Sequence, residues 1–587
     1  MNMDMDMSGG DVPWLDQPVL LHSSRADKCK LTDAQCHYRN GHWRYWYQAD
    51  HVYALNTVYF CCAVIAVFAI ANFLVRLTPD WMKRTKLWRA TTSISRYMSY
   101  RGYGFPVLKY WSPSVGVITL GVLGAIFFFA MTVGPKPFYW PTDADYGSSP
   151  PIATRAGWMA LALLPFVLAL SVKANMISAL TGIPHEKLQV FHHWSSYAMF
   201  VLALVHTFPF IIYHISKGDM VKQWKTSLVY WTGIGAIIPQ AYLTIMSLPF
   251  IRNRFYEFFK ATHMIAAILF VVFFFLHCDF RLSSWDYFIA SGVIYALCLL
   301  TAQVRTYLMH GVHTATLELI PSGLLRVSVP TIINWTPGQH VFVRFLTSDL
   351  HLLTAHPFTI SSVCHGPEKI GKASEIIFYI KPRGGVTGRL AALAAKQSGI
   401  QKRILIEGPY GGVSAHHMAK LDTILVVAGG SGGGSRLQWS GEEIRRRLQV
   451  VFATRDTAMA NWYVDEIESR LSQSTTLPGS DSGFETAVSV HITANRDPTI
   501  STSTLDTEKT LTPKLPPTEI TTTGSFSLNV HRNARPDIPG LIARTVAMAH
   551  SNPLPNGKKQ RIAALAQIRT FGGEVEELYL HSEPFAW

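Results

Sequence analysis

The sequence predicts a multi-domain membrane protein in which a seven-helix transmembrane domain precedes a small β-barrel and an α/β domain. Three observations predict this fold class. Of 587 residues, 49% are hydrophobic and 15% are charged, which is too apolar for a soluble protein of several domains. Seven apolar runs are each long enough to cross about 30 Å of hydrocarbon. From about residue 313 they give way to short alternating strands with glycine and proline turns.

The expected spans lie near 53–75, 114–134, 157–172, 190–214, 227–249, 260–279 and 286–308. The loop between the first two is strongly basic, with Arg76, Lys83, Arg84, Lys86, Arg89, Arg96, Arg101 and Lys109. The positive-inside rule places such a loop in the cytosol. Seven crossings then leave residues 1–52 outside as an N-terminal tail and everything after residue 309 inside. The expected membrane domain is therefore 53–312.

Charge and cysteine content exclude several other classes. The formal net charge is +14, but much of it lies beside apolar stretches, which is typical of membrane topology and not of a nucleic-acid partner. The seven cysteines show no paired metal-ligand spacing, so no zinc or iron–sulfur site is expected. Residues 1–10 lack a basic segment followed by an apolar core, which predicts no cleavable signal peptide.

Four histidines in the apolar runs repeat one spacing. His192 and His206 are fourteen residues apart, and so are His263 and His277. Fourteen residues return a helix to nearly the same face, about 21 Å further along its axis. Ionisable side chains are costly inside a bilayer and mark functional positions there. We therefore expect each of these two helices to offer two haem ligands, at two depths.

The two histidine helices are parallel because one span separates them. His192 then pairs with His263 at the cytosolic depth, and His206 with His277 at the outer depth. Bis-imidazole ligation leaves iron no open position, which suits electron transfer. His193 competes with His192, but it projects roughly 140° away from His206 on the helix, so His192 is the expected ligand.

Three segments carry a resemblance to a known family. Tyr47–Asp50 with Ala54, Leu188–Trp194 and Phe255–His263 match the pattern of the fungal ferric/cupric metalloreductases, relatives of the NADPH oxidases, and the likeness extends over nearly the whole chain. The resemblance implies that the four histidines ligate two b-type haems. It also implies a cytosolic FAD-binding β-barrel at 313–420 and an α/β nucleotide-binding, ferredoxin-reductase-like domain for NADPH at 421–587.

The expected barrel contains a segment that resembles the flavin-binding signature of the ferredoxin-reductase-like superfamily. A barrel edge with an aromatic ring, hydroxyls and backbone N–H groups is suited to an isoalloxazine ring. The residues expected to bind FAD here are His356, Pro357, Phe358, Thr359, Ser361 and Ser362. Further along, basic side chains and glycine amides before a helix are suited to a pyrophosphate. These residues are Lys381, Arg383, Gly385 and Thr387.

The last domain begins with an apolar strand, Thr423–Ala428, followed by a glycine-rich turn, a helix-like stretch and a second strand, Leu448–Ala453. The turn resembles the family's nicotinamide-dinucleotide loop. The residues expected to bind NADPH are Gly429, Gly430, Ser431, Gly432, Gly433 and Arg455, the last as a partner of the 2′-phosphate. A Ser/Thr/Pro-rich stretch at about 472–526 is an expected disordered insertion in which 486–493 is one candidate strand.

The C-terminal part departs from the family in one respect. The resemblance implies that the last aromatic ring, Trp587, covers the flavin until nicotinamide displaces it. However, no cysteine follows Cys364, so the Cys-Gly-Pro motif that the family usually carries near the hydride-transfer site is absent. Either segments of this domain are missing from the chain, or its nicotinamide site is weakened or altered.

The resemblance implies a plasma-membrane reductase that moves electrons from cytosolic NADPH through FAD and two haems to ferric or cupric chelates outside, in support of metal uptake. Its expected partners are membrane lipids, the metal chelates and an iron permease/oxidase system. Two alternatives stay open. One is a superoxide-producing NADPH oxidase, whose members typically have six spans. The other is a haem membrane protein that no longer accepts hydride.

Overall fold

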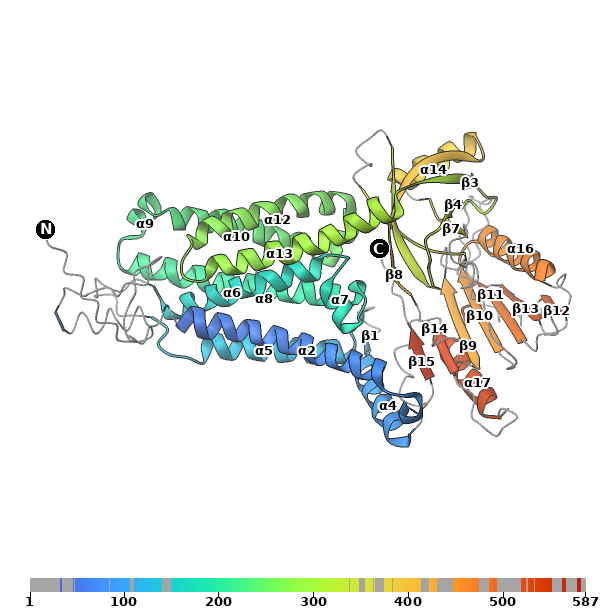
Figure 1. The fold of residues 1–587 in the computed structure, drawn as a ribbon, viewed down its shortest axis with the longest axis horizontal. Coiled ribbons are helices and arrows are strands. Elements are labelled where there is room, and N and C mark those ends of the chain that lie inside the picture. Colours follow the sequence, from blue (N-terminus) through green and yellow to red (C-terminus); the bar gives the residue numbers. More distant parts are fainter. Residues whose placement is uncertain are drawn as a thin grey trace, which may run out of the picture. The chain divides into compact units, whose positions relative to one another are not determined.

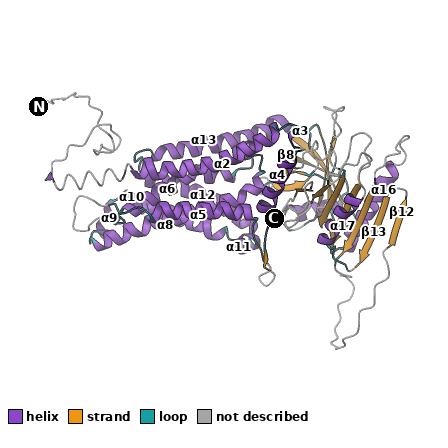
Figure 2. Ribbon diagram, turned by 90° about the horizontal axis from the view of Figure 1, so that it is seen from below, coloured by secondary structure: helices purple, strands orange, loops and turns teal. Residues whose placement is uncertain are grey.

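The computed structural model (Figures 1 and 2) describes residues 32–33, 46, 48–83, 85–105, 110–139, 149–336, 338–347, 354–362, 364, 374–382, 384–412, 422–429, 447–474, 485–493, 519–523, 526–532, 534–551, 562–565 and 578–581. The chain forms two compact units. One consists mainly of residues 1–78 and 118–301, and the other of residues 79–117 and 302–586.

Seven helices of the described residues are long and apolar enough to cross a membrane, which confirms the predicted spans. They are α2 (Leu55–Leu77) with the preceding π-helix η1 (Ala49–Ala54), α5 (Val115–Val133), α6 (Pro151–Ser171), α8 (His185–Ser216), α10 (Leu228–Met246), α12 (Tyr256–Cys278), and α13 (Ser284–Gln303) continued by the π-helix η3 (Val304–His310). Short helices join them: α3 (Asp80–Lys83), α4 (Lys86–Tyr100), α7 (Met176–Thr181), α9 (Met220–Thr226) and α11 (Pro249–Arg254). A two-stranded hairpin, β1 (Gly104–Phe105) and β2 (Tyr110–Trp111), follows α4.

Helix α6 lies inside the helical bundle and the other spans surround it (Figure 1). It is rich in alanine and leucine, and its side chains are buried along most of its length. Its closest neighbour is α8, and α10 packs in the same way on α12. The two helices that carry the predicted haem ligands therefore each pack most extensively on one neighbour, α8 on α6 and α12 on α10.

The second unit begins with an antiparallel sheet that curls into a barrel. Its strands lie in the order β6-β5-β8-β3-β4-β7. They are β3 (Val312–Leu319), β4 (Leu325–Thr331), β5 (Gln339–Phe345), β6 (His356–Thr359), β7 (Ser374–Ile380) and β8 (Ile400–Gly411), with helix α14 (Gly385–Lys396) after β7. The two edges of the sheet meet where the N–H of Ser361 donates to the carbonyl of Ile377 at 2.8 Å. The alternating apolar side chains of these strands fill the interior, as their period of two predicted.

A seven-stranded sheet follows, in the order β12-β13-β11-β10-β9-β14-β15. The strands are β9 (Thr423–Gly429), β10 (Arg447–Thr454), β11 (Glu485–Ile492), β12 (Glu519–Thr523), β13 (Phe526–Arg532), β14 (Ile562–Leu565) and β15 (Leu578–His581), with helices α16 (Thr457–Ser474) and α17 (Ile538–Ser551). All neighbours are parallel except β12 and β13. The interval about 472–526, for which a disordered insertion was expected, contains β11 and β12, and β11 coincides with the candidate strand at 486–493.

The connection pattern defines a topological switch point in this sheet, between β9 and β14. From β9 the chain continues to β10, β11 and β13 on one side, and then returns to place β14 on the other side of β9. Such a reversal of strand order is where open α/β sheets bind ligands, beyond the carboxyl ends of the strands. The carboxyl end of β9 is Gly429, where the predicted dinucleotide loop begins.

Candidate functional site

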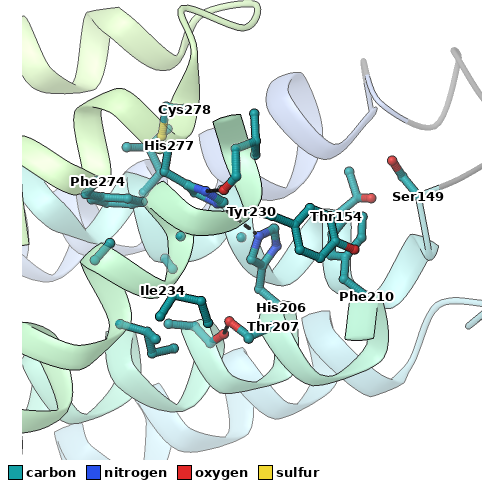
Figure 3. Close-up of a pocket in the computed structure, with 18 of the residues that line it drawn as sticks. Ser149, Thr154, His206, Thr207, Phe210, Tyr230, Ile234, Phe274, His277 and Cys278 are labelled. Carbon is teal, nitrogen blue, oxygen red and sulfur yellow. Dashed lines mark hydrogen bonds between the residues drawn. The ribbon is translucent and has the colours of Figure 1, made fainter. Parts of the chain in front are cut away.

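The structure brings two of the predicted haem ligands together across the membrane bundle. The Nε2 atoms of His206 on α8 and His277 on α12 lie 3.4 Å apart, and the ring planes are at 86° to one another. Figure 3 shows the two rings turned toward one another inside the bundle. A metal–imidazole bond is roughly 2.0 Å long, so a metal between the two Nε2 atoms would need them about 4 Å apart. Each ring would have to move by only a few tenths of an ångström from its present position.

Both rings are fixed in the same way by the neighbouring helix. His206 Nδ1 lies 2.8 Å from the carbonyl oxygen of Ala153 on α6, and His277 Nδ1 lies 2.8 Å from that of Val229 on α10. A carbonyl oxygen only accepts, so each Nδ1 carries the proton and donates it. Metal-ligating histidines are oriented by this kind of bond, which fixes the tautomer.

The two Nε2 atoms are consequently both unprotonated in the neutral rings. Two lone pairs that face one another at 3.4 Å repel unless a cation lies between them. A proton would make one ring an imidazolium, which is costly inside a bilayer. The donor set of His206 and His277 therefore fits a bound metal, and the haem iron that the sequence predicted satisfies it.

A cavity of about 290 Å³ surrounds these rings. Three polar atoms of its lining are buried without a hydrogen-bond partner among the described residues: the hydroxyls of Tyr230 and Ser284 and the Nε of Arg281. Burial lowers the pKa of the Arg281 guanidinium, and the attraction of the Asp279 carboxylate offsets this only in part. Buried donors without partners are rare, and here they suit an anionic group of a ligand in the cavity. The sequence pattern did not single out these residues, although Arg281 lies only four positions after His277, just beyond the end of α12.

The same cavity lining includes His214, two turns beyond His206 on α8. Its Nδ1 lies 2.7 Å from Oδ1 of Asp219, which Gln223 also contacts. Burial raises the pKa of Asp219, but the hydrogen bonds from His214 and Gln223 outweigh it, so this pKa lies below its ordinary value. The His214–Asp219 pair closes one end of α8 and was not predicted from the sequence.

The second predicted ligand pair also lies on facing helices. His192 Nδ1 is 3.0 Å from the carbonyl oxygen of Val167 on α6, and His263 is close enough to His192 for an electrostatic interaction. The Nδ1 atom of His263 is buried without a hydrogen-bond partner among the described residues. His193 lies beside both rings. Only His192 shows the carbonyl bond that His206 and His277 share, so it remains the expected ligand.

The predicted FAD segment forms the edge of the barrel. Strand β6 holds His356, Pro357, Phe358 and Thr359, pairs with β5, and forms one edge of the sheet that the described residues make. Ser361 is buried at the closure, and the hydroxyl oxygen of Ser362 accepts from the N–H of Ile377 at 3.1 Å. An edge strand leaves backbone groups free for a ligand.

The predicted pyrophosphate residues lie at the start of α14. Lys381 is exposed just after β7, and Gly385, with φ of 70°, is the first residue of the helix. The N-cap Gly384 supplies no side-chain cap, and the N-terminus of this 12-residue helix is suited to an anion. Thr387 is half-buried in the first turn, and Arg383 lies outside the described residues.

The predicted NADPH residues are described only in part. Gly429 pairs with Ala453 across β9 and β10, and Arg455 is exposed two residues further on, so both lie at the same carboxyl edge. Gly430, Ser431, Gly432 and Gly433 lie outside the described residues, and so does Trp587. The edge position suits a dinucleotide site, whose loop stays a prediction.

Fold and site together define a multi-pass membrane protein with facing intramembrane histidines and a flavin-binding barrel. Residues 156–274 match the family model for the ferric reductase like transmembrane component, and residues 309–414 match that for an FAD-binding domain. The chain is 33% identical over 411 residues to the probable cell surface ferric reductase kap2 of Aspergillus oryzae, covering 64% of this chain and 53% of that protein. It is 31% identical to the ferric/cupric reductase transmembrane component 7 of Saccharomyces cerevisiae, covering 58% and 54%. These matches confirm the resemblance to the fungal ferric/cupric reductases.

The chain spans about half the length of the curated relatives it matches. Among solved structures, a ferredoxin NADP+ reductase from Neisseria gonorrhoeae with bound FAD and NADP aligns with 46% of this chain and 98% of its own, at 12% identity and a TM-score of 0.28. A flavohemoglobin from Malassezia yamatoensis aligns with 74% and 97%, at 10% identity and a TM-score of 0.27. These TM-scores are too low to support a conclusion.

Proposed function

We propose that this chain is a transmembrane oxidoreductase that transfers electrons from cytosolic NADPH to ferric or cupric chelates outside the cell. The observation that carries the proposal is the facing pair of unprotonated Nε2 atoms on His206 and His277. Haem iron ligated by two imidazoles would have no open position, which would suit electron relay and exclude substrate binding at that iron. The names of the relatives, ferric and cupric reductases, support the choice of acceptor.

The chain's own residues would hold two b-type haems in the bundle. His206 and His277 would ligate one, and His192 and His263 the other, with the carbonyls of Ala153, Val229 and Val167 fixing the orientation of three of the rings. The surrounding apolar helices exclude water and so keep the pairs in a low-dielectric medium. When bound, haem iron supplies reversible one-electron chemistry at each site.

On the cytosolic side, β6 and the start of α14 would hold FAD, and the carboxyl edge of β9 and β10 would hold NADPH. The edge groups of β6 would orient the isoalloxazine ring, and the uncapped amides of α14 with Lys381 would neutralise the pyrophosphate. FAD is required because nicotinamide gives two electrons and haem iron takes one. Arg455, exposed after β10, would favour the 2′-phosphate of NADPH.

The proposed orientation follows from the basic loop between the first two spans. Between residues 78 and 114 there are seven basic residues and one acidic residue, Asp80, which favours the cytosolic side. The N-terminus is then outside, and the FAD-binding barrel and the α/β domain are cytosolic. We place the protein in the plasma membrane, where reduction outside would release metal for an iron permease/oxidase system.

Stopped-flow spectroscopy tests the proposal. Purified, FAD-loaded protein is mixed anaerobically with NADPH, the haem absorption bands are followed, and ferric citrate is then added. Haem reduction followed by iron-dependent reoxidation is the expected result. Reoxidation only after oxygen is admitted would instead identify a superoxide-producing oxidase. Haems that stay oxidised with NADPH but reduce with dithionite would show that the donor domain is inactive, and the enzyme assignment would fall.

A further inference from the structure

Helix α4 has an apolar face whose side chains are exposed. It is strongly amphipathic, and its exposed residues include Leu87, Ile94 and Met98, at 76%, 63% and 56% exposure. Successive residues are about 100° apart on a helix, so spacings of seven and four put these three side chains on one stripe. Trp88 and Thr92, on another side, are half-buried. In a helix of a soluble protein the apolar stripe faces the core, so α4 has the opposite arrangement.

The position of α4 in the chain keeps it close to the membrane surface. Helix α2 ends at Leu77, nine residues before α4 begins at Lys86, and the next span, α5, begins at Val115. A connection between two neighbouring spans starts and ends at the same side of the bilayer. Trp81, 68% exposed, lies between α2 and α4, and tryptophan is enriched at membrane interfaces.

The charge of this segment complements a lipid surface. Seven basic residues lie between 78 and 114, among them Lys83 just before α4 and the exposed Lys86 beside the stripe, and Asp80 is the one acidic residue. An apolar stripe with lysine and arginine around it is typical of helices that lie in the plane of an anionic membrane. Long basic side chains reach up from such a position to phosphate groups.

We propose that α4 is an interfacial helix that inserts Leu87, Ile94 and Met98 among the acyl chains of anionic phospholipids, while Lys83 and Lys86 bind their headgroups. The bilayer is the occupant that the exposed stripe and the adjacent spans both favour. No residue of α4 is among those proposed to bind haem, FAD or NADPH, so the proposal stands apart from the electron-transfer function. It rests on the proposed orientation only for the statement that the lipids belong to the cytosolic leaflet.

Site-directed spin labelling of the full-length protein in nanodiscs tests this proposal. A label at Ile94→Cys reports on the stripe, and a label at Ser93→Cys, one residue earlier and about 100° round the helix, is the matched control. The signal of the identically treated parent protein is subtracted. We expect the ratio of oxygen accessibility to nickel-chelate accessibility to be several-fold higher at 94 than at 93. Equal ratios, or a label at 94 that neither reagent reaches, would overturn the proposal, and Met98→Cys gives an independent second reading.

Lipid charge tests the headgroup part. Nanodiscs of phosphatidylcholine alone are compared with nanodiscs that also contain phosphatidylserine, and the ratio at 94 should rise with the anionic lipid. The double substitution Lys83→Gln and Lys86→Gln should remove this rise, and high salt should do the same. If the accessibility ratio at 94 changes neither with phosphatidylserine nor with the two lysine substitutions, the basic residues do not bind headgroups.

Discussion

Gly157 on α6 lies directly against the ring of His206 on α8. A Cβ atom at Gly157 would be 2.4 Å from Nδ1 of His206, and one at Gly233 on α10 would be 2.9 Å from Nδ1 of His277. Each glycine is one turn after the residue whose carbonyl holds the ring, since Ala153 precedes Gly157 and Val229 precedes Gly233 by four residues. The absence of a side chain is what lets each histidine reach its carbonyl.

This relationship predicts the effect of a single methyl group. Gly157→Ala should displace the His206 ring and lower the amount of haem bound at the proposed outer site severalfold, because overpacking a rigid site costs about 1–3 kcal/mol. Absorbance of the haem per mole of purified protein measures this. Gly124→Ala, in α5 with open space around it, is the matched control and should bind the full amount. Equal haem in both variants would mean that the His206 ring is free to move.

Substitutions at His192 and His193 should separate the ligand from its neighbour. His192→Ala should remove one haem per chain, because His192 has the backbone anchor to Val167, whereas His193→Ala should retain both. Haem-to-protein stoichiometry and the low-spin ferric signal in electron paramagnetic resonance give the answer. The reverse result would assign His193 as the ligand.

Arg281 should act on the redox potential of the proposed outer haem. Arg281→Gln removes a buried positive charge from the cavity, so the oxidised haem gains stability and the midpoint potential should fall. Haem retention should also fall by about 10-fold, as for other outer-shell partners. Spectroelectrochemical titration measures the first effect, and Arg254→Gln on α11 is the control. A potential that does not move would place the Arg281 charge away from the haem.

The closure of the barrel should depend on one serine hydroxyl. Ser362→Ala leaves the N–H of Ile377 without its side-chain acceptor, which costs about 1–3 kcal/mol. The barrel should therefore unfold and release its flavin at a lower temperature. Flavin fluorescence on heating reports the transition. Glu375→Ala, exposed on the same strand, should leave it unchanged. Similar melting temperatures for the two variants would show that this bond contributes nothing.

The α/β sheet should lose stability as pH falls through the range 6.5 to 4. Burial, with the neighbouring His531 ring stacked at 4.4 Å, lowers the pKa of His491 from 6.5 to about 4. Between these two pKa values the unfolded chain binds a proton at His491 that the folded sheet does not. The contribution of neutral His491 to the free energy of unfolding is therefore complete above pH 6.5 and is lost on acidification. Hydrogen exchange of the β11 amides at pH 5 and 7.5, corrected for intrinsic rates, measures the loss. His531→Asn should reduce this acid-induced loss of protection. If protection falls as much in the variant as in the parent protein, the His491–His531 pair is not the cause of the loss.

The spans, the barrel strands and the two strands around the glycine loop were predictable because each follows from hydrophobic period and length alone. The repeated spacing of fourteen residues likewise placed His206 and His277 on matching faces. What the sequence did not reveal are contacts between elements that the chain separates widely. The carbonyl of Ala153 and the open position at Gly157 depend on how α6 packs on α8, which no local pattern encodes. The glycine loop after β9 and the ring of Trp587 remain predictions.

The strand order has a consequence for biosynthesis. The barrel cannot close before β8 has been translated, because β8 lies between β3 and β5 in the sheet. Strand β9 lacks its second neighbour until β14 has been made at Ile562–Leu565, more than 130 residues after β9. Membrane helices can enter the bilayer one after another, whereas this sheet exposes an unpaired edge throughout the intervening synthesis. Nascent chains that stop before β14 should therefore be substrates for chaperones and proteases, because β9 then has an uncovered edge.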